Sequence, residues 1–186
     1  MAQDRSVVHA AFWMVGALVA LSSMAVIVKS LSGVFDTYEM MMYRSAFSVV
    51  LMMVVLWLFG RWGDIRLTYI KLHIWRNISH FTGQNLWFFA IGALPLAQVF
   101  ALEFTTPLWV LIFSALFLAE RMTVLKALLA LAGFGGTIVA ISPIGFEVNG
   151  GVITGILCAI GFAGSIIFTK KLTAVETVLS ILFFLA

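Results

Sequence analysis

Runs of predominantly apolar residues follow one another along almost the whole chain. A helix needs roughly 20 such residues to cross the hydrocarbon core of a bilayer. Six runs of about this length occupy residues 10–29, 38–59, 75–94, 96–118, 124–142 and 151–169. A seventh begins near Thr177. The sequence therefore predicts an all-α, polytopic membrane protein, a helix bundle of six full spans and the start of a seventh.

Composition excludes the soluble classes. Of the 186 residues, 63% are apolar and 10% are charged, and the mean hydropathy is +1.13. Soluble domains are about 45–50% apolar and about 25% charged. Disordered, collagen-like and coiled-coil chains do not fit this composition either. Cys158 is the single cysteine, so an intrachain disulfide framework is excluded. We therefore expect the lipid bilayer to be the medium in which the chain folds.

The basic residues predict the orientation. With a cytoplasmic N-terminus, the eleven Lys and Arg residues divide into nine inside, one outside and one within a span. The nine inside are Arg5, Arg61, Arg66, Lys71, Arg76, Arg121, Lys126, Lys170 and Lys171. Lys29 lies outside, and Arg44 falls within the second span. This positive-inside asymmetry accounts for the net charge of +3 without a nucleic-acid partner. The first run is longer than the hydrophobic region of a signal peptide, so we interpret it as a retained span.

An internal similarity indicates a repeat. With small gaps, residues 16–29 resemble residues 155–170, because both are Gly/Ala/Leu spans that end in lysine. The repeating unit then has five spans, and an odd number places the second copy upside down. We predict a first five-span repeat at 1–145 and the start of an inverted second repeat at 146–186. Inverted repeats are typical of secondary transporters, which hold their substrate at the repeat interface.

The seventh run stops at Ala186. About ten helical residues rise only about 15 Å, half the thickness of the hydrocarbon core. Either the chain is a fragment of a longer gene product, or the protein is truncated.

Two charged residues lie within predicted spans. Arg44 and Glu103 are each about 9–11 Å from the same face of the membrane by helical rise. Ionisable groups at such depth face a cavity or each other. The two residues therefore either anchor a substrate or handle protons, or they form a structural ion pair between the second and fourth spans.

Polar and aromatic residues near the membrane midplane are further candidates. Gln84 and Asn85 either line a substrate site or hold helices together by hydrogen bonds. Trp87, Thr106 and Trp109 combine apolar surface with a polar group and suit a binding pocket. Such residues are common in an apolar chain rich in aromatic side chains, so each one taken alone favours packing over binding.

Three other features have a structural interpretation. Pro107 breaks the fourth span and frees a backbone carbonyl, which favours a kink that serves gating or binding. The glycines of the fifth and sixth runs favour close helix packing. His73 and His80 do not form a metal constellation, although His80 is a candidate for contact with substrate or protons.

The fourth and fifth runs carry a family resemblance. Residues 97–108 read AQVFALEFTTPL, residues 118–123 read LAERMT, and a glycine-rich fifth span follows. Together they resemble the EamA-type transporters of the drug/metabolite transporter superfamily. Arg44, in the stretch Met42-Tyr43-Arg44-Ser45-Ala46, is similar to the arginine of that family's second span. Glu103 departs from the family pattern, in which we expect a neutral residue at this position in many members.

The resemblance implies ten spans in two inverted five-helix repeats, of which this chain supplies the first repeat and the start of the second. It also implies cytoplasmic termini, a bacterial inner-membrane location and a central cavity open alternately to each side. The expected function is secondary transport of a small metabolite or drug, by ion coupling or exchange. Arg44, Gln84, Asn85, Trp87, Glu103, Thr106 and Trp109 are the expected substrate-binding residues, with Pro107 at a helix break.

Other functions stay open at this stage. The alternative is a non-transporting truncated protein, or a subunit that needs a partner chain, either a second copy or the missing C-terminal half. An enzyme is not expected, because no Ser-His, His-rich or paired-acid cluster has suitable spacing. The sequence implies no cofactor and contains no nucleotide-binding motif.

Overall fold

A computed structural model describes residues 2–66, 68–118, 123–141 and 149–186. Every regular element in these ranges is a helix. In chain order they are α1 (Ala2–Leu31), α2 (Thr37–Phe59), the short 3-10 helix η1 (Trp62–Asp64), α3 (Ile70–Ala93), α4 (Leu96–Glu103), α5 (Thr106–Leu118), α6 (Val124–Ile141), α7 (Gly150–Thr173) and α8 (Val178–Phe183). Residues 119–122 of the LAERMT stretch, which include Arg121, and the predicted repeat boundary at 145/146 lie outside the described residues.

Four segments are long and apolar enough to cross a membrane. They are residues 9–31, 37–59, 96–118 and 150–173. The apolar helix at 124–136 is shorter. α3 has 24 residues, but polar side chains such as Lys71, Arg76 and Gln84 interrupt its apolar surface. The helices coincide with the predicted runs, so the all-α architecture is confirmed, whereas the count of six full spans and the inverted repeat stay predictions.

The fourth run is broken, as Pro107 predicts. α4 ends at Glu103 and α5 begins at Thr106. Proline lacks an N–H and is tolerated in the first turn of a helix, so Pro107 fits the start of α5. The turn is closed by Thr105, whose N–H and Oγ1 both donate to the carbonyl of Leu102, at 3.0 and 2.7 Å. The break places Glu103 at the end of one helix and Thr106 at the start of the next.

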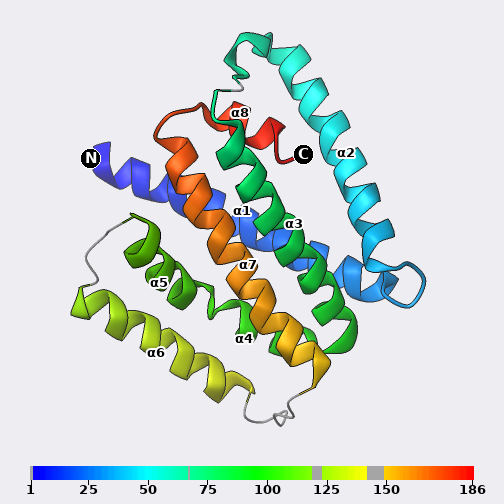
Figure 1. Ribbon diagram of the computed structural model, residues 1–186, viewed down its shortest axis with the longest axis vertical. Helices are drawn as coiled ribbons and strands as arrows, with labels where there is room; N and C mark the ends of the chain where they lie inside the picture. Colours follow the sequence, from blue (N-terminus) through cyan, green and yellow to red (C-terminus); the bar gives the residue numbers. More distant parts are fainter. Residues whose placement is uncertain (1, 67, 119–122, 142–148) are drawn as a thin grey trace.

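α3 and α7 lie side by side through the centre of the molecule, and α1 crosses behind them (Figure 1). Glycines bring the two central helices into close contact. A Cβ atom on Gly161 of α7 would lie 2.8 Å from the Cα of Gly83 on α3. A Cβ on Gly155 would lie 2.6 Å from Leu102 of α4. The packing role predicted for the glycines of the sixth run is confirmed, and Gly136 of the fifth run has no such neighbour within 4 Å.

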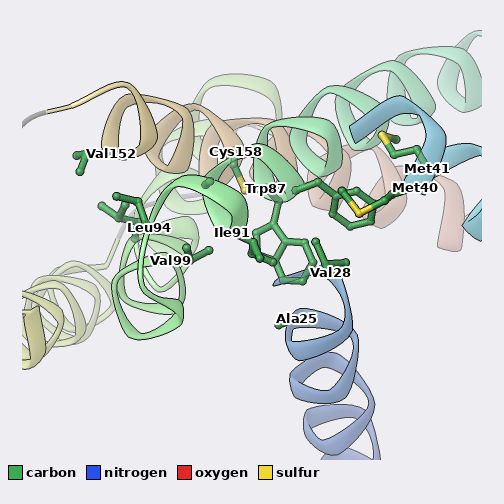
Figure 2. Close-up of a cluster of buried hydrophobic side chains, with 13 residues drawn as sticks. Ala25, Val28, Met40, Met41, Trp87, Ile91, Leu94, Val99, Val152 and Cys158 are labelled. Carbon is green, nitrogen blue, oxygen red and sulfur yellow. The ribbon is translucent and has the colours of Figure 1, made fainter. Parts of the chain in front are cut away.

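A buried apolar cluster fills the space where α1, α2, α3, α4 and α7 meet (Figure 2). Trp87 and Phe88 of α3 are its largest fully buried side chains, at 1% and 2% exposure. Ala25 and Val28 of α1 face Trp87 from one side in Figure 2. Cys158 of α7 completes the cluster and is 1% exposed.

Lys29 ties α1 to the end of α3. Its ammonium group donates to the backbone carbonyls of Ile91, Gly92 and Leu94, at 2.8, 3.1 and 3.0 Å. The last carbonyls of a helix have no partner within the helix, and a cation there also opposes the negative end of the helix dipole. Lys29 therefore caps α3 and uses all three of its hydrogen-bond donors to do so.

α2 is well capped but packs little. Asp36 accepts from the N–H of Glu39, and the Glu39 side chain accepts from the N–H of Asp36, at 2.8 and 3.0 Å. Gly60 ends the helix with φ 61°, in the left-handed region that glycine adopts readily. Only 6% of the most apolar stretch of α2 is buried, and Figure 1 shows the helix set apart at the edge of the molecule.

A polar cluster around Glu176 joins α8 and the preceding turn to the start of α3. The Glu176 carboxylate lies 2.7 Å from Nε2 of His73 and 3.1 Å from Oγ of Ser180, and accepts from the N–H of Tyr69 at 3.2 Å. Arg76 donates to Oγ1 of Thr169 and to the carbonyl of Ile181. The side chains of His73 and Glu176 are 3% and 1% exposed. We call this set the Glu176 cluster.

Candidate functional site

A cavity of about 630 Å³ opens between α1, α3, α4, α5 and α7. Its volume is within the range of about 300–1,000 Å³ that small-molecule sites occupy. The lining side chains are mostly apolar and aromatic, with a few polar groups. They are Leu18, Leu21, Ser22, His80, Phe100, Glu103, Phe104, Thr106, Pro107, Phe162, Ser165 and Ile166.

Glu103 supplies the one carboxylate among these lining residues. Its Oε2 accepts a hydrogen bond of 2.9 Å from Nε1 of Trp87. Trp87 is held by the apolar cluster described above, so the indole fixes the carboxylate from the protein side. Because Glu103 is the last residue of α4, the break before α5 lets its side chain face the cavity.

His80 lines the same cavity from α3. Its ring lies 5.7 Å, between centroids, from that of Phe162 on α7. An imidazole and a carboxylate therefore border one space. Imidazole and carboxylate are the side chains that most readily exchange protons near neutral pH or bind a charged ligand.

Three hydroxyl groups border the cavity: Ser22 of α1, Thr106 of α5 and Ser165 of α7. Oγ1 of Thr106 is buried and has no hydrogen-bond partner in the described part of the chain. A buried hydroxyl without a partner is costly, and a ligand group or a water molecule in the cavity would satisfy it.

The predicted site residues do not all lie in this cavity. Glu103, Thr106 and Pro107 line the cavity, and Trp87 contacts it through Glu103. Gln84, buried on α3, and Trp109, partly buried on α5, are not among the lining residues.

Asn85 holds two helices together by hydrogen bonds, which is the second of the two roles considered for it. Its Nδ2 donates to Oγ1 of Thr37 at 3.2 Å and to Sδ of Met41 at 3.4 Å, and both partners belong to α2. This amide therefore links α3 to the weakly packed α2.

Arg44 borders a different cavity. This second space, of about 580 Å³, lies between α1 and α2, and its walls are almost entirely apolar. Nη2 of Arg44 donates to Oγ of Ser45 at 3.5 Å, and its Nε is buried without a partner among the described residues. The structural ion pair between Arg44 and Glu103 is not formed. Glu103 instead accepts from Trp87, and Arg44 belongs to α2, which stands at the edge of the molecule (Figure 1).

Sequence reasoning places the sixth run at the substrate site but does not single out the residues of α7 that line the cavity. Phe162, Ser165 and Ile166 line the cavity, yet residues of these types are common in any apolar span. The available signal was their position beside Gly161 and Gly164, which bring this face of α7 against α3. Among the described residues, no group of three or more His, Cys, Asp or Glu side chains is placed to hold a metal ion.

Comparison with known proteins gives the family. The EamA-like transporter family matches residues 9–142, well over half of the sequence. The chain belongs to the EamA-like transporter family. The EamA-type resemblance is thereby confirmed, and with its several apolar helices the chain is a multi-pass membrane protein. No solved structure matches it.

Curated relatives of this EamA-family chain are named as transporters. An S-adenosylmethionine uptake transporter of Rickettsia bellii is 26% identical over 174 residues, covering 94% of this chain and 60% of the relative. A riboflavin transporter of Brucella anthropi is 32% identical over 117 residues, covering 63% of this chain and 41% of the relative. A pseudopaline exporter of Pseudomonas aeruginosa is 26% identical over 166 residues, covering 88% and 57%. The chain thus spans no more than about 60% of the length of these relatives.

Proposed function

We propose that this chain forms the substrate-binding part of a secondary transporter that moves a small metabolite or drug across the bacterial inner membrane. The cavity between α1, α3, α4, α5 and α7 carries the proposal. It joins helices of the predicted first repeat to α7, the first helix of the predicted second repeat. A site at the interface of two inverted repeats is where alternating-access carriers bind their substrate.

The family and the relatives' names support transport as the function. Uptake and export both occur among those names, so the direction of transport is not fixed by similarity. We place the N-terminus in the cytoplasm because most Lys and Arg residues then face inward. Coupling to an ion gradient or exchange would drive the cycle.

Transport assays on membrane vesicles test this proposal. Vesicles that contain the full gene product are loaded with, or exposed to, radiolabelled S-adenosylmethionine and riboflavin without added nucleotide. We expect faster flux of at least one compound than in vesicles that lack the protein. Correctly inserted protein with no flux of any metabolite tested would contradict the proposal and favour a non-transporting membrane protein or an incomplete subunit.

Two neighbouring serines on α1 provide a matched pair of variants. Ser22 lines the proposed substrate cavity, and Ser23 lines the separate cavity beside Arg44. We expect Ser22→Trp to reduce flux by at least about tenfold, equivalent to about 1.4 kcal/mol, because the indole fills the cavity. Ser23→Trp should retain most of the flux. The reverse pattern would move the substrate site to the cavity beside Arg44.

A further inference from the structure

The cavity contains an acidic group, Glu103, for which the described residues show no ion pair with a basic group. Trp87 is the hydrogen-bond partner that the structure gives to the Glu103 carboxylate, and an indole N–H is neutral. Among the described residues that line the cavity there is no Lys or Arg, and the ring of the one histidine, His80, lies 5.7 Å from that of Phe162. A carboxylate in such an apolar setting is costly unless an opposite charge or a proton compensates it.

The surrounding surface suits a weakly hydrated cation. Phe100, Phe104 and Phe162 line the cavity together with Glu103. Aromatic faces attract cations through the ring quadrupole, and they also stack on planar rings. The hydroxyl groups of Ser22, Thr106 and Ser165 supply the few additional hydrogen bonds.

The same lining disfavours an anion. A carboxylate or phosphate group on the substrate would meet Glu103, and among the described lining residues only the imidazole of His80 could balance its charge. Like charges at close range in a poorly solvated site repel strongly. Arg44, which would provide this balance, borders the other cavity.

We propose that Glu103 selects substrates that carry an organic cation, such as a sulfonium or quaternary ammonium centre, next to an apolar or planar ring. Trp87 acts as the positioning residue, because it holds the carboxylate toward the cavity. This inference rests on the proposed function. It narrows the class of substrate from any small metabolite or drug to compounds that carry a positive charge.

Binding to the purified full gene product tests the inference. The probes are two pairs that differ mainly in charge: S-adenosylmethionine with S-adenosylhomocysteine, and choline with its uncharged analogue 3,3-dimethyl-1-butanol. We expect the cation of each pair to bind at least about tenfold more tightly, as one ion pair or cation–π contact allows. Equal affinities within both pairs would overturn the inference.

Variants at Glu103 make the test specific. Glu103→Gln removes the charge at nearly constant volume. We then expect the cation of each pair to bind no more than about twofold more tightly than its uncharged analogue, a difference of about 0.4 kcal/mol. Glu103→Asp keeps the charge and should keep most of the preference. Trp87→Phe removes the indole N–H that positions the carboxylate but retains Glu103 itself, so it should weaken the preference for the cation. An unchanged preference in Glu103→Gln would overturn the role of this residue, and a thermal melt of each variant shows whether it has folded.

Transport of riboflavin separates the two proposals. Flux or binding of riboflavin, with neither cation bound, would overturn the inference and leave the transport function intact. Absence of binding and flux for every probe would overturn both.

Discussion

Lys29 shows how a single residue can have a role that its position in the sequence conceals. As the one basic residue predicted outside, it reads as an exception to the positive-inside pattern. In the structure it satisfies three carbonyls at the end of α3. A charged donor that pairs with partly buried carbonyls stabilises a fold more than a neutral one does.

We therefore expect Lys29→Met to destabilise the protein by about 1.5–3 kcal/mol, the range for hydrogen bonds to charged groups. A lower midpoint of thermal unfolding in detergent would show this loss. Lys126→Met is the control, because the exposed Lys126 side chain lies on α6. Equal midpoints for the two variants would mean that the α3 cap adds nothing to stability.

The site residues show what the sequence predicts at this scale. Glu103 and Thr106 stood out because polar groups are rare in an apolar span, and both line the cavity. Of the two interpretations left open for Arg44 and Glu103, the structural ion pair is not formed, because helical rise gives the depth of a residue but not the direction in which it faces. His80 was weighed as a lesser candidate, since a single histidine carries no spacing signal.

At the scale of elements, the positions of the helices were predictable and their contacts were not. Bilayer thickness fixes the length of a span, so apolar runs locate helices well. The face that packs is harder to identify, because lipid and protein interior are both apolar and leave little hydrophobic periodicity. Glycines were the useful signal, since close approach of α3 and α7 requires a missing side chain at Gly83 and Gly161.

We expect Gly161→Ala to separate α3 from α7 and to destabilise the protein by about 1–3 kcal/mol, as overpacking does. The added Cβ would meet the backbone of Gly83, which cannot rotate away. Unfolding midpoints in detergent measure the effect. Gly136→Ala on α6 is the matched control, because no atom outside its own helix and chain neighbours lies within 4 Å of its Cβ position. A midpoint for Gly161→Ala at or above that of the control would contradict this account of the contact.

At the scale of the whole molecule, the Glu176 cluster connects regions far apart in the sequence. With the contact of Arg66 to Ser180, it joins residues 66–76 to residues 169–181, which belong to the two predicted repeats. Burial disfavours the charged form of Glu176 and by itself would raise the pKa of this carboxyl group. Hydrogen bonds from His73, the Tyr69 N–H and Ser180 outweigh it, so the pKa of Glu176 lies below its ordinary value of 4.5.

This shift predicts acid sensitivity. A carboxyl group whose pKa is lowered on folding stabilises the native state above its ordinary pKa, and that contribution is lost as the pH falls toward the native value. Unfolding midpoints should therefore decrease as the pH falls below about 4.5. The decrease should be smaller in Glu176→Gln. Glu39→Gln is the control: glutamine can still accept the hydrogen bond from the Asp36 N–H, so this variant should show the same pH dependence as the unaltered protein. Identical pH profiles for all three would exclude Glu176 as the source.

Cys158 gives the molecule a built-in reporter of helix separation. Its thiol is enclosed where α7 meets the core, so a small thiol reagent has no access while that contact persists. An alternating-access cycle that moves α7 away from α3 and α4 would expose the sulfur for part of each turnover. The rate of alkylation of Cys158, measured with and without substrate, would then report how often α7 separates from its neighbours.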